Sequence, residues 1–199
     1  MTRVFLIRHG MTDVVGVRLT SRQPGIHLND AGRRQAADLP RRIGAVSLAA
    51  IFASPLERAQ ETAAPLAAAF GLDVQTLDGV NEVGFGAWTG ARLGELNADR
   101  AWVHYNEFRS LTPAPEGESL LAVQARAVLA VDSVRTHHEG RAIAIVSHGD
   151  VVRALVMLYL GMPIDFHHRV EIAPASISIV DLGDAAPRVT GVNLLGAVS

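Results

Sequence analysis

The fold is decided near the start of the chain by the stretch Val4-Phe5-Leu6-Ile7-Arg8-His9-Gly10. Its unbroken run of apolar residues is typical of a strand that is buried on both faces, as in a parallel sheet. The polar tripeptide follows where such a strand would deliver its carboxyl end to a loop. Ligands of open α/β sheets bind at that edge. The stretch therefore predicts a parallel sheet with a polar site at its carboxyl edge.

Two further apolar runs end in the same way. Ala50–Ala53 is followed by Ser54-Pro55-Leu56-Glu57-Arg58-Ala59, and Ala142–Val146 is followed by Ser147-His148-Gly149. Because the carboxyl ends of parallel strands meet at one edge, we expect the two His and two Arg of the three motifs to converge. Arg side chains and helix N-termini bind tetrahedral anions, and a neutral imidazole facing a phosphoryl group can act as a nucleophile.

The rest of the chain alternates strands with helices. Further strands are predicted at 74–77, 177–180 and 189–194, and helices at 31–43, 57–70, 95–108, 119–138 and 150–160. Pro40 is expected to kink or end the first helix, and Ser54 to cap the second. The alternation predicts one three-layer α/β domain over residues 1–199 with a mostly parallel central sheet. The Gly- and Pro-rich segment 81–117 is expected to be an insertion over the active site.

Composition excludes several kinds of chemistry. The chain has no Cys, and all 18 of its basic residues are Arg, which excludes thiolate zinc sites, lysine Schiff bases and Walker-type phosphate loops. A net charge of −2 with scattered Arg is unlike a nucleic-acid binder. No apolar run approaches the ~20 residues of a membrane span, and Met1–Arg8 lacks a signal-peptide core. We therefore expect a cytoplasmic protein without nucleic-acid or membrane partners.

Taken together, the motifs resemble those of the histidine phosphatase superfamily, in the branch shared with the cofactor-dependent phosphoglycerate mutases. The resemblance covers roughly residues 3–160 and implies a phosphoglycerate mutase-like fold. Several motifs in the family's order are far more specific than the Arg-His-Gly tripeptide alone. Beyond the three strand ends, the matching residues are Glu61-Thr62-Ala63, Asn81-Glu82, Phe85-Gly86, Trp88-Thr89-Gly90, Gly117-Glu118-Ser119 and Arg126.

The resemblance implies roles for the residues at the strand ends. His9 would be the nucleophile that forms a phosphohistidine intermediate. Arg8 and Arg58 would bind the phosphoryl oxygens, and His148 would donate a hydrogen bond to the same group. His9 must then be neutral, so one ring nitrogen is expected to donate to a backbone carbonyl, and the nearby Arg side chains to lower its pKa.

The resemblance assigns three further residues to the site. Glu82 would protonate the leaving oxygen and then activate water, which requires burial or a phosphate neighbour to raise its pKa. Thr12 and Gly149 are the other expected contacts to the substrate. No metal and no cofactor are expected, because the Arg side chains and the second His neutralise the transferring charge. The His pair at 137–138 is interpreted as favouring a helix dipole, and the pair at 167–168 fits no metal spacing cleanly.

Val15 departs from the family pattern. It stands where many members have an Asn that helps to hold the phosphoryl group. The residues that could compensate are Arg18, Thr20, Ser21 and Arg22. The segment Val15–His27 is otherwise the least family-like part of the chain, and we expect it to alter the geometry of the phosphate site or the selection of the leaving group.

Three functions are compatible with these residues. The leading one is a phosphatase acting on a small phosphorylated metabolite; a phosphoglycerate mutase and a catalytically silent phosphate-binding domain are the alternatives. All the expected catalytic positions are filled, which argues against a silent domain. The chain is shorter than glycolytic mutases, which favours hydrolysis. Trp102, His104 and Tyr105 could contact substrate or pack in the protein, and an oligomer is compatible with the sequence.

Overall fold

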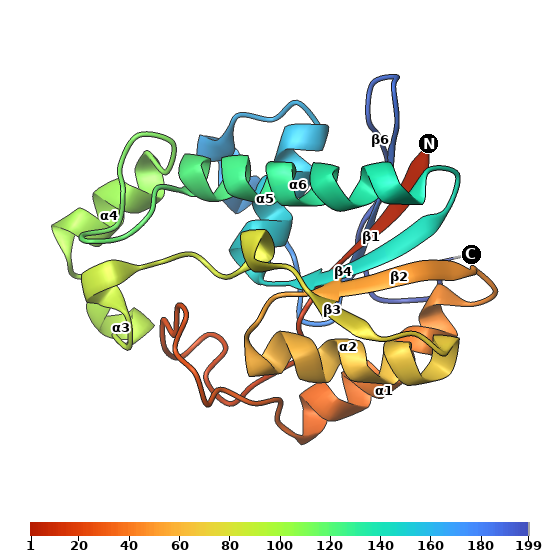
Figure 1. Cartoon of the computed structure of the whole chain (residues 1–199). Coiled ribbons are helices and arrows are strands. Elements are labelled where there is room, and N and C mark those ends of the chain that lie inside the picture. The colour runs from red at the N-terminus through yellow and green to blue at the C-terminus, as the bar shows by residue number, and fades with distance from the viewer. Residues whose placement is uncertain (199) are drawn as a thin grey trace.

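The computed structural model describes residues 1–198 (Figure 1). Its centre is a mixed six-stranded sheet with the order β3-β2-β4-β1-β5-β6. The first four strands run parallel to one another, whereas β5 is antiparallel to β1, and β6 to β5. The predicted α/β architecture is therefore confirmed. The strands are β1 (Thr2–Arg8), β2 (Leu48–Ala53), β3 (Val74–Thr76), β4 (Ala142–Ser147), β5 (Ile177–Leu182) and β6 (Arg188–Leu194).

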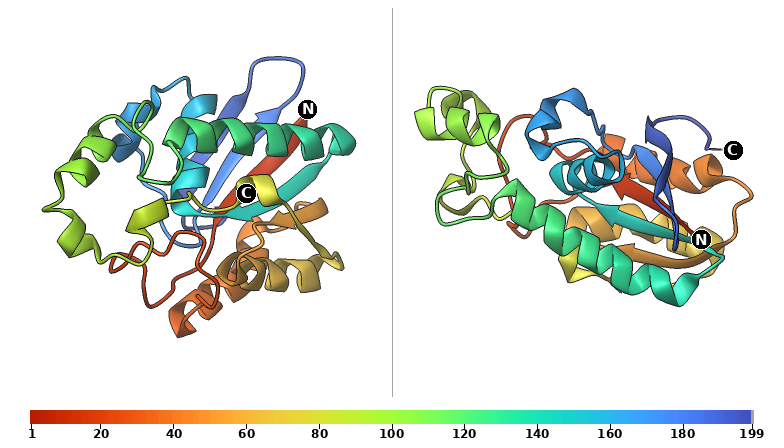
Figure 2. Two further views of the ribbon diagram at one scale, coloured as in Figure 1. Left: turned by 60° about the vertical axis from the view of Figure 1, so that its left-hand side comes forward. Right: turned by 90° about the horizontal axis from the view of Figure 1, so that it is seen from above.

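Helices cover both faces of the sheet (Figures 1 and 2). Within residues 1–198, none of them is long and apolar enough to cross a membrane. The α-helices are α1 (Asp30–Ile43), α2 (Glu57–Phe70), α3 (Leu93–Leu96), α4 (Arg100–Glu107), α5 (Leu120–Arg135) and α6 (Gly149–Tyr159). Short 3-10 helices are η1 (Asp78–Val80), η2 (Gly86–Trp88), η3 (Thr136–His138) and η4 (Ile164–Arg169).

The apolar run of β1 explains the three layers. Successive side chains of a strand point to opposite faces of the sheet. Val4 and Leu6 therefore pack in the cluster that contains α5 and α6, whereas Phe5 and Ile7 pack in the cluster that contains α1 and α2. Burial on both faces is the reason that the run has no polar alternation.

The predicted helix at 95–108 is divided into two helices. Asp99 lies between α3 and α4, and its carboxylate accepts a hydrogen bond from the Ala101 amide at 2.8 Å, which caps α4. Asp is a strong N-cap residue, so it ends one helical pattern and begins another. Both helices lie beyond the carboxyl ends of the strands, at the same end of the molecule as the loop between β1 and α1 (Figures 1 and 2).

Of the two alternatives predicted for Pro40, the one in which it ends α1 is wrong, because the helix continues to Ile43. Proline removes one backbone donor from the helix. The last helical turn, which follows Pro40, is instead held by side-chain hydrogen bonds to other parts of the chain. The buried guanidinium of Arg42 donates to three carbonyls of distant segments. These are the carbonyls of Ala175, Leu194 and Gly196, at 2.7, 2.7 and 3.3 Å.

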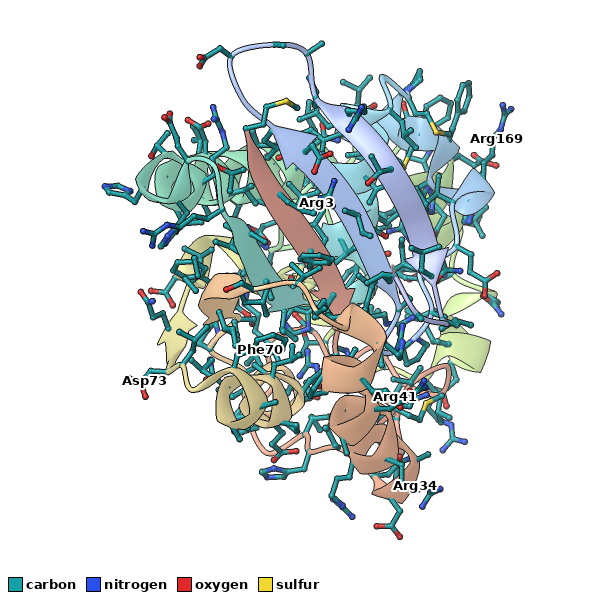
Figure 3. All side chains as sticks on the ribbon, turned by 90° about the vertical axis from the view of Figure 1, so that its right-hand side faces the viewer. Arg3, Arg34, Arg41, Phe70, Asp73 and Arg169 are labelled. Carbon is teal, nitrogen blue, oxygen red and sulfur yellow. The ribbon has the colours of Figure 1, made fainter. Side chains whose placement is uncertain are left out.

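We expect Arg42→Ala to lower the free energy of unfolding by about 2–4 kcal/mol, because buried carbonyls lose a charged donor. The matched control is its neighbour Arg41, which lies on α1 in Figure 3 and pairs with Asp38 at the surface. Loss of an exposed pair costs about 0–1 kcal/mol. Urea denaturation measures both variants, and equal losses would contradict the anchoring role of Arg42.

Candidate active site

The pairing of the central strands brings the predicted residues together. β1 and β4 pair with Arg8 opposite Ser147, and β2 lies on the other side of β4. The next residues, His9 and His148, therefore leave the sheet side by side, and their ring centroids lie 5.4 Å apart. The predicted convergence of three strand ends is confirmed.

His9 is buried and its tautomer is set by the backbone. Its Nδ1 lies 2.7 Å from the Gly10 carbonyl, which can only accept, so Nδ1 carries the proton. Burial lowers the pKa of His9 to about 3, with further contributions from Arg58 and Arg8. The imidazole is therefore neutral at physiological pH with a free electron pair on Nε2, as the sequence predicted.

The loop that carries His9 packs against α1 and α2, the two helices on one face of the sheet. The Gly10 amide donates to Thr62 Oγ1 of α2 at 3.0 Å, and that hydroxyl donates to the Arg58 carbonyl at 2.6 Å. On the other side, a Cβ atom on Gly10 would lie 2.8 Å from the Gly32 carbonyl oxygen of α1. The Thr62 and Gly10 positions of the motifs thus fix the His9 backbone.

Buried cationic donors without a partner surround His9. Arg58 donates from Nη2 to the Ser21 carbonyl at 2.9 Å, but among residues 1–198 its Nη1 has no partner. Arg8 donates from Nη1 to the Ile172 carbonyl at 2.6 Å, but its Nε has none. Burial lowers the pKa of both groups. Buried donors without hydrogen-bond partners are costly, and more so on charged groups, so the arrangement is complementary to an anion.

His148 is fully buried and is held by Ser54. Its Nε2 lies 2.7 Å from Ser54 Oγ, and its Nδ1 has no hydrogen-bond partner among the described residues. Burial, together with Arg58 and His9, lowers the pKa of His148. The prediction that Ser54 caps α2 is wrong, because that helix begins at Glu57 and its start has no side-chain cap. The Ser54 hydroxyl bonds to the imidazole instead.

Glu82 faces His148 across the site. Its Oε2 lies 3.6 Å from His148 Nδ1, and its Oε1 accepts from the Val83 amide at 2.9 Å. Burial raises the pKa of Glu82 to about 7, and the charge of Asp150 adds to the increase. The carboxyl group therefore exchanges its proton near neutral pH, as a general acid and base requires.

Asp150 is a charged neighbour of Glu82 that the sequence did not reveal. Its two carboxylate oxygens pair with Arg109 at 2.9 Å and Arg153 at 2.5 Å. Against the effect of burial, these cations hold the pKa of Asp150 below its usual range, so its charge persists and acts on Glu82. An Asp in the first turn of a helix is common because it favours the helix dipole, so the sequence carried no distinctive signal.

A cleft of about 170 Å³ opens onto His9. Thr12 and Gly149 both line it, and the buried Thr12 hydroxyl has no partner within residues 1–198. At the start of α6, a Cβ atom on Gly149 would lie 3.2 Å from the Arg8 guanidinium carbon. Gly149 therefore lets Arg8 pack directly against the helix terminus.

Of the four residues after Val15 that could compensate for the missing Asn, three line the cleft and the fourth bonds to the segment that carries Glu82. Arg18, Thr20 and Ser21 line the cleft. Arg22 instead donates to Glu118 at 2.7 Å and to the Glu82 carbonyl at 2.8 Å. It supports the segment that carries Glu82 and is not among the residues that line the cleft.

The aromatic residues of segment 81–117 are used for packing. Trp102 and Tyr105 are buried, and their rings stack with centroids 5.8 Å apart. Phe85 and Trp88 pack edge-on or tilted against the same pair. His104 lies on the exposed side of α4. Of these residues, Phe85 alone reaches the cleft.

The histidine pairs at 137–138 and 167–168 were the other candidates for a metal site. His167 is buried, and its ring centroid lies 3.7 Å from that of His168. Within residues 1–198, no group of three or more His, Asp or Glu side chains is placed to hold a metal ion.

Comparison with known proteins identifies the family. The histidine phosphatase superfamily (branch 1) matches residues 4–195. The chain belongs to this branch. The bifunctional protein Rv2228c of Mycobacterium tuberculosis is 35% identical to it over 205 residues, which cover 98% of this chain and 54% of that protein. The chain thus spans about half the length of the first curated relatives it matches.

Other relatives match over most of both chains. A probable phosphoglycerate mutase, GpmB of Erwinia tasmaniensis, is 30% identical over 186 residues, or 91% of this chain and 85% of that one. The structure of Bacillus stearothermophilus YhfR covers 100% of this chain and 98% of its own, with 30% identity and a TM-score of 0.89. Mycobacterial glucosyl-3-phosphoglycerate phosphatase Rv2419c covers 96% and 98%, with 26% identity and a TM-score of 0.83.

Proposed function

We propose that this protein is a phosphatase that hydrolyses a small phosphomonoester through a phosphohistidine on His9. The observation that carries the proposal is the set of unpartnered buried donors around a neutral imidazole. Within residues 1–198, these donors are Arg8 Nε, Arg58 Nη1 and Thr12 Oγ1; His148 Nδ1 also lacks a partner and can donate in the tautomer in which Nε2 accepts from Ser54. A phosphoryl group offers several charged acceptor oxygens, so it would satisfy donors that the protein leaves unpaired.

In the first step, Nε2 of His9 attacks phosphorus and the bond to the leaving oxygen breaks. Glu82 gives its proton to that oxygen, so the product departs as an alcohol. Nδ1 keeps its proton and its bond to the Gly10 carbonyl, which stabilises the positive charge that develops on the ring. Arg8 and Arg58 stabilise the charge on the transferring group.

In the second step, water attacks the phosphohistidine. Glu82, now a carboxylate, accepts a proton from the water as the new oxygen–phosphorus bond forms. The phosphorus–nitrogen bond breaks, and its electron pair returns to Nε2 of His9. Inorganic phosphate leaves, and the acid and the nucleophile have recovered their starting protonation states.

The dimensions of the cleft support a small substrate. Its volume of about 170 Å³ is below the range of about 300–1,000 Å³ that is usual for pockets that bury drug-sized ligands. Phe85 and Leu93 line its wall and belong to segment 81–117, which we propose to be an insertion over the active site. The relatives that act on glucosyl-3-phosphoglycerate and phosphoserine, as their names state, support a phosphorylated metabolite as the substrate class.

A phosphoglycerate mutase is the second candidate, favoured by the 30% identity to probable mutases of the GpmB type. Both activities use the same phosphohistidine, and they differ in whether water or a second alcohol accepts the phosphoryl group. A mutase would depend on 2,3-bisphosphoglycerate. Isomerisation of 3-phosphoglycerate that needs this compound and exceeds the release of inorganic phosphate would favour the mutase.

The direct test is hydrolysis of p-nitrophenyl phosphate near pH 6 with EDTA present. We expect full turnover in excess chelator, because the proposed steps use only side chains of the protein. A requirement for added zinc or magnesium would contradict this mechanism. Absence of turnover with this substrate, with phosphoglycerates and with a panel of phosphorylated metabolites would overturn the proposed function.

The pH dependence of kcat/KM should follow the protonation of the Glu82 carboxyl. A general acid works in its protonated form, so kcat/KM should fall as pH rises through the Glu82 pKa of about 7. The low pKa of His9, about 3, keeps the nucleophile neutral across this range. Glu82→Gln should remove this decline and slow the hydrolysis of phenyl phosphate by about 10²–10⁴-fold. Because both enzymes are assayed with the same ester, ionisation of the ester affects both pH profiles equally and cancels in their ratio. An identical decline in the variant would exclude Glu82 as the general acid.

A further inference from the structure

Ser21 connects the two halves of the active site. It is buried, and its φ of +50° lies in the left-handed region that residues other than glycine seldom adopt. Its backbone carbonyl accepts from Arg58 Nη2 at 2.9 Å. Its hydroxyl donates to the Val83 carbonyl at 2.8 Å and accepts from the Phe85 amide at 3.0 Å. A strained residue with every polar contact directed at the site suggests a role there.

The contacts of Ser21 reach both chemical partners of His9. On one side, its carbonyl fixes the guanidinium of Arg58, whose other nitrogen is free for the phosphoryl group. On the other side, it holds the carbonyl of Val83, and the amide of the same residue donates to Glu82 Oε1 at 2.9 Å. Ser21 therefore stands between the anion-binding side chain and the acid.

We propose that Ser21 is a positioning residue. By bonding to Arg58 through its carbonyl and to the Glu82 segment through its hydroxyl, it fixes the position of the Glu82 carboxyl relative to the phosphate site. This inference rests on the proposed phosphatase function and assigns a residue beyond its catalytic groups. It also changes the expectation that the Ser21 hydroxyl compensates for the missing Asn at the phosphate. That hydroxyl is already bonded on both sides to the Glu82 segment.

The left-handed backbone explains why two substitutions are needed to test the idea. Ser21→Ala removes the hydroxyl and keeps the strain. Ser21→Gly also removes the hydroxyl but adopts a positive φ without strain, so it should fold where the alanine variant does not. The control is Ser178→Ala on β5, which removes another fully buried hydroxyl. That hydroxyl accepts from the Asn193 amide at 3.2 Å.

The experiment compares p-nitrophenyl phosphate, which has a good leaving group, with phenyl phosphate, which needs its leaving oxygen protonated. We expect both Ser21 variants to lower kcat for phenyl phosphate by about 10- to 100-fold, as a displaced catalytic group does. The loss with p-nitrophenyl phosphate should be smaller, and Ser178→Ala should leave the ratio of the two substrates unchanged. A Ser21 variant that loses stability but keeps the wild-type ratio would overturn the proposal.

A second measurement does not depend on turnover. The carbon-13 signal of the Glu82 carboxyl, assigned by its loss in Glu82→Gln, gives the titration midpoint of that group. Burial is the main cause of the raised pKa of Glu82, so a loosened segment should admit water and lower the midpoint in Ser21→Gly. An unchanged midpoint would overturn the role of Ser21. If the wild-type enzyme were inactive but the Glu82 midpoint still shifted in Ser21→Gly, only the phosphatase function would be refuted.

Discussion

Replacing His9 by alanine should reduce turnover to below about a thousandth of the wild-type rate, because no covalent intermediate can form without the nucleophile. Its Nε2 is the only ring nitrogen of His9 left free by the bond from Nδ1 to the Gly10 carbonyl. Hydrolysis of p-nitrophenyl phosphate measures the loss directly.

A matched control and a chemical trap make this result specific. His137 is exposed, and its Nδ1 bonds only to the Ser133 carbonyl one turn earlier, so His137→Ala should retain full activity. Acid quenching during turnover of a labelled substrate should leave an acid-labile phosphohistidine on the wild-type enzyme and none on His9→Ala. Equal activity of wild type and His9→Ala would mean that the assigned nucleophile is wrong.

Arg58→Ala should have the second largest effect. Arg58 is 1% exposed, and its Nη1 has no partner within the described chain. Removing a preorganised donor from the transition state costs about 2–4 kcal/mol, which corresponds to a loss of about 30- to 1,000-fold in kcat/KM. The loss should appear in kcat/KM with p-nitrophenyl phosphate, and a change smaller than tenfold would contradict the role.

Two further variants separate charge from geometry at this position. Arg58→Lys keeps a positive charge but loses the planar fork that bonds Ser21 and the phosphoryl group together, so it should recover only part of the activity. Arg34, which extends from α1 into solvent in Figure 3, provides the control. Arg34→Ala should match the wild type, since an exposed arginine away from the cleft contributes little to the reaction.

The sequence predicted those elements whose residues interact with close neighbours along the chain. Apolar runs such as Val4–Ile7 identified the strands, because burial on both faces leaves no polar position. The cap of α1 is such a local contact, because the Asn29 side chain accepts from the Gly32 amide at 2.9 Å. Ser54 was interpreted wrongly as a cap, and Pro40 does not end its helix, because distant partners decide their surroundings: His148 bonds to Ser54, and Arg42 anchors the helical turn after Pro40 to distant carbonyls.

By itself, the sequence determined the α/β fold and a candidate set of His, Arg and Glu residues. Order, spacing and residue type carry that information along the chain. Only the tertiary structure decided which nitrogen of His9 is free, why Glu82 holds its proton, and which residues support them. These properties depend on burial and on partners far away in sequence, such as Asp150 beside Glu82 and Ser21 beside Arg58. Desolvation and through-space charge act on distances that only the folded chain defines.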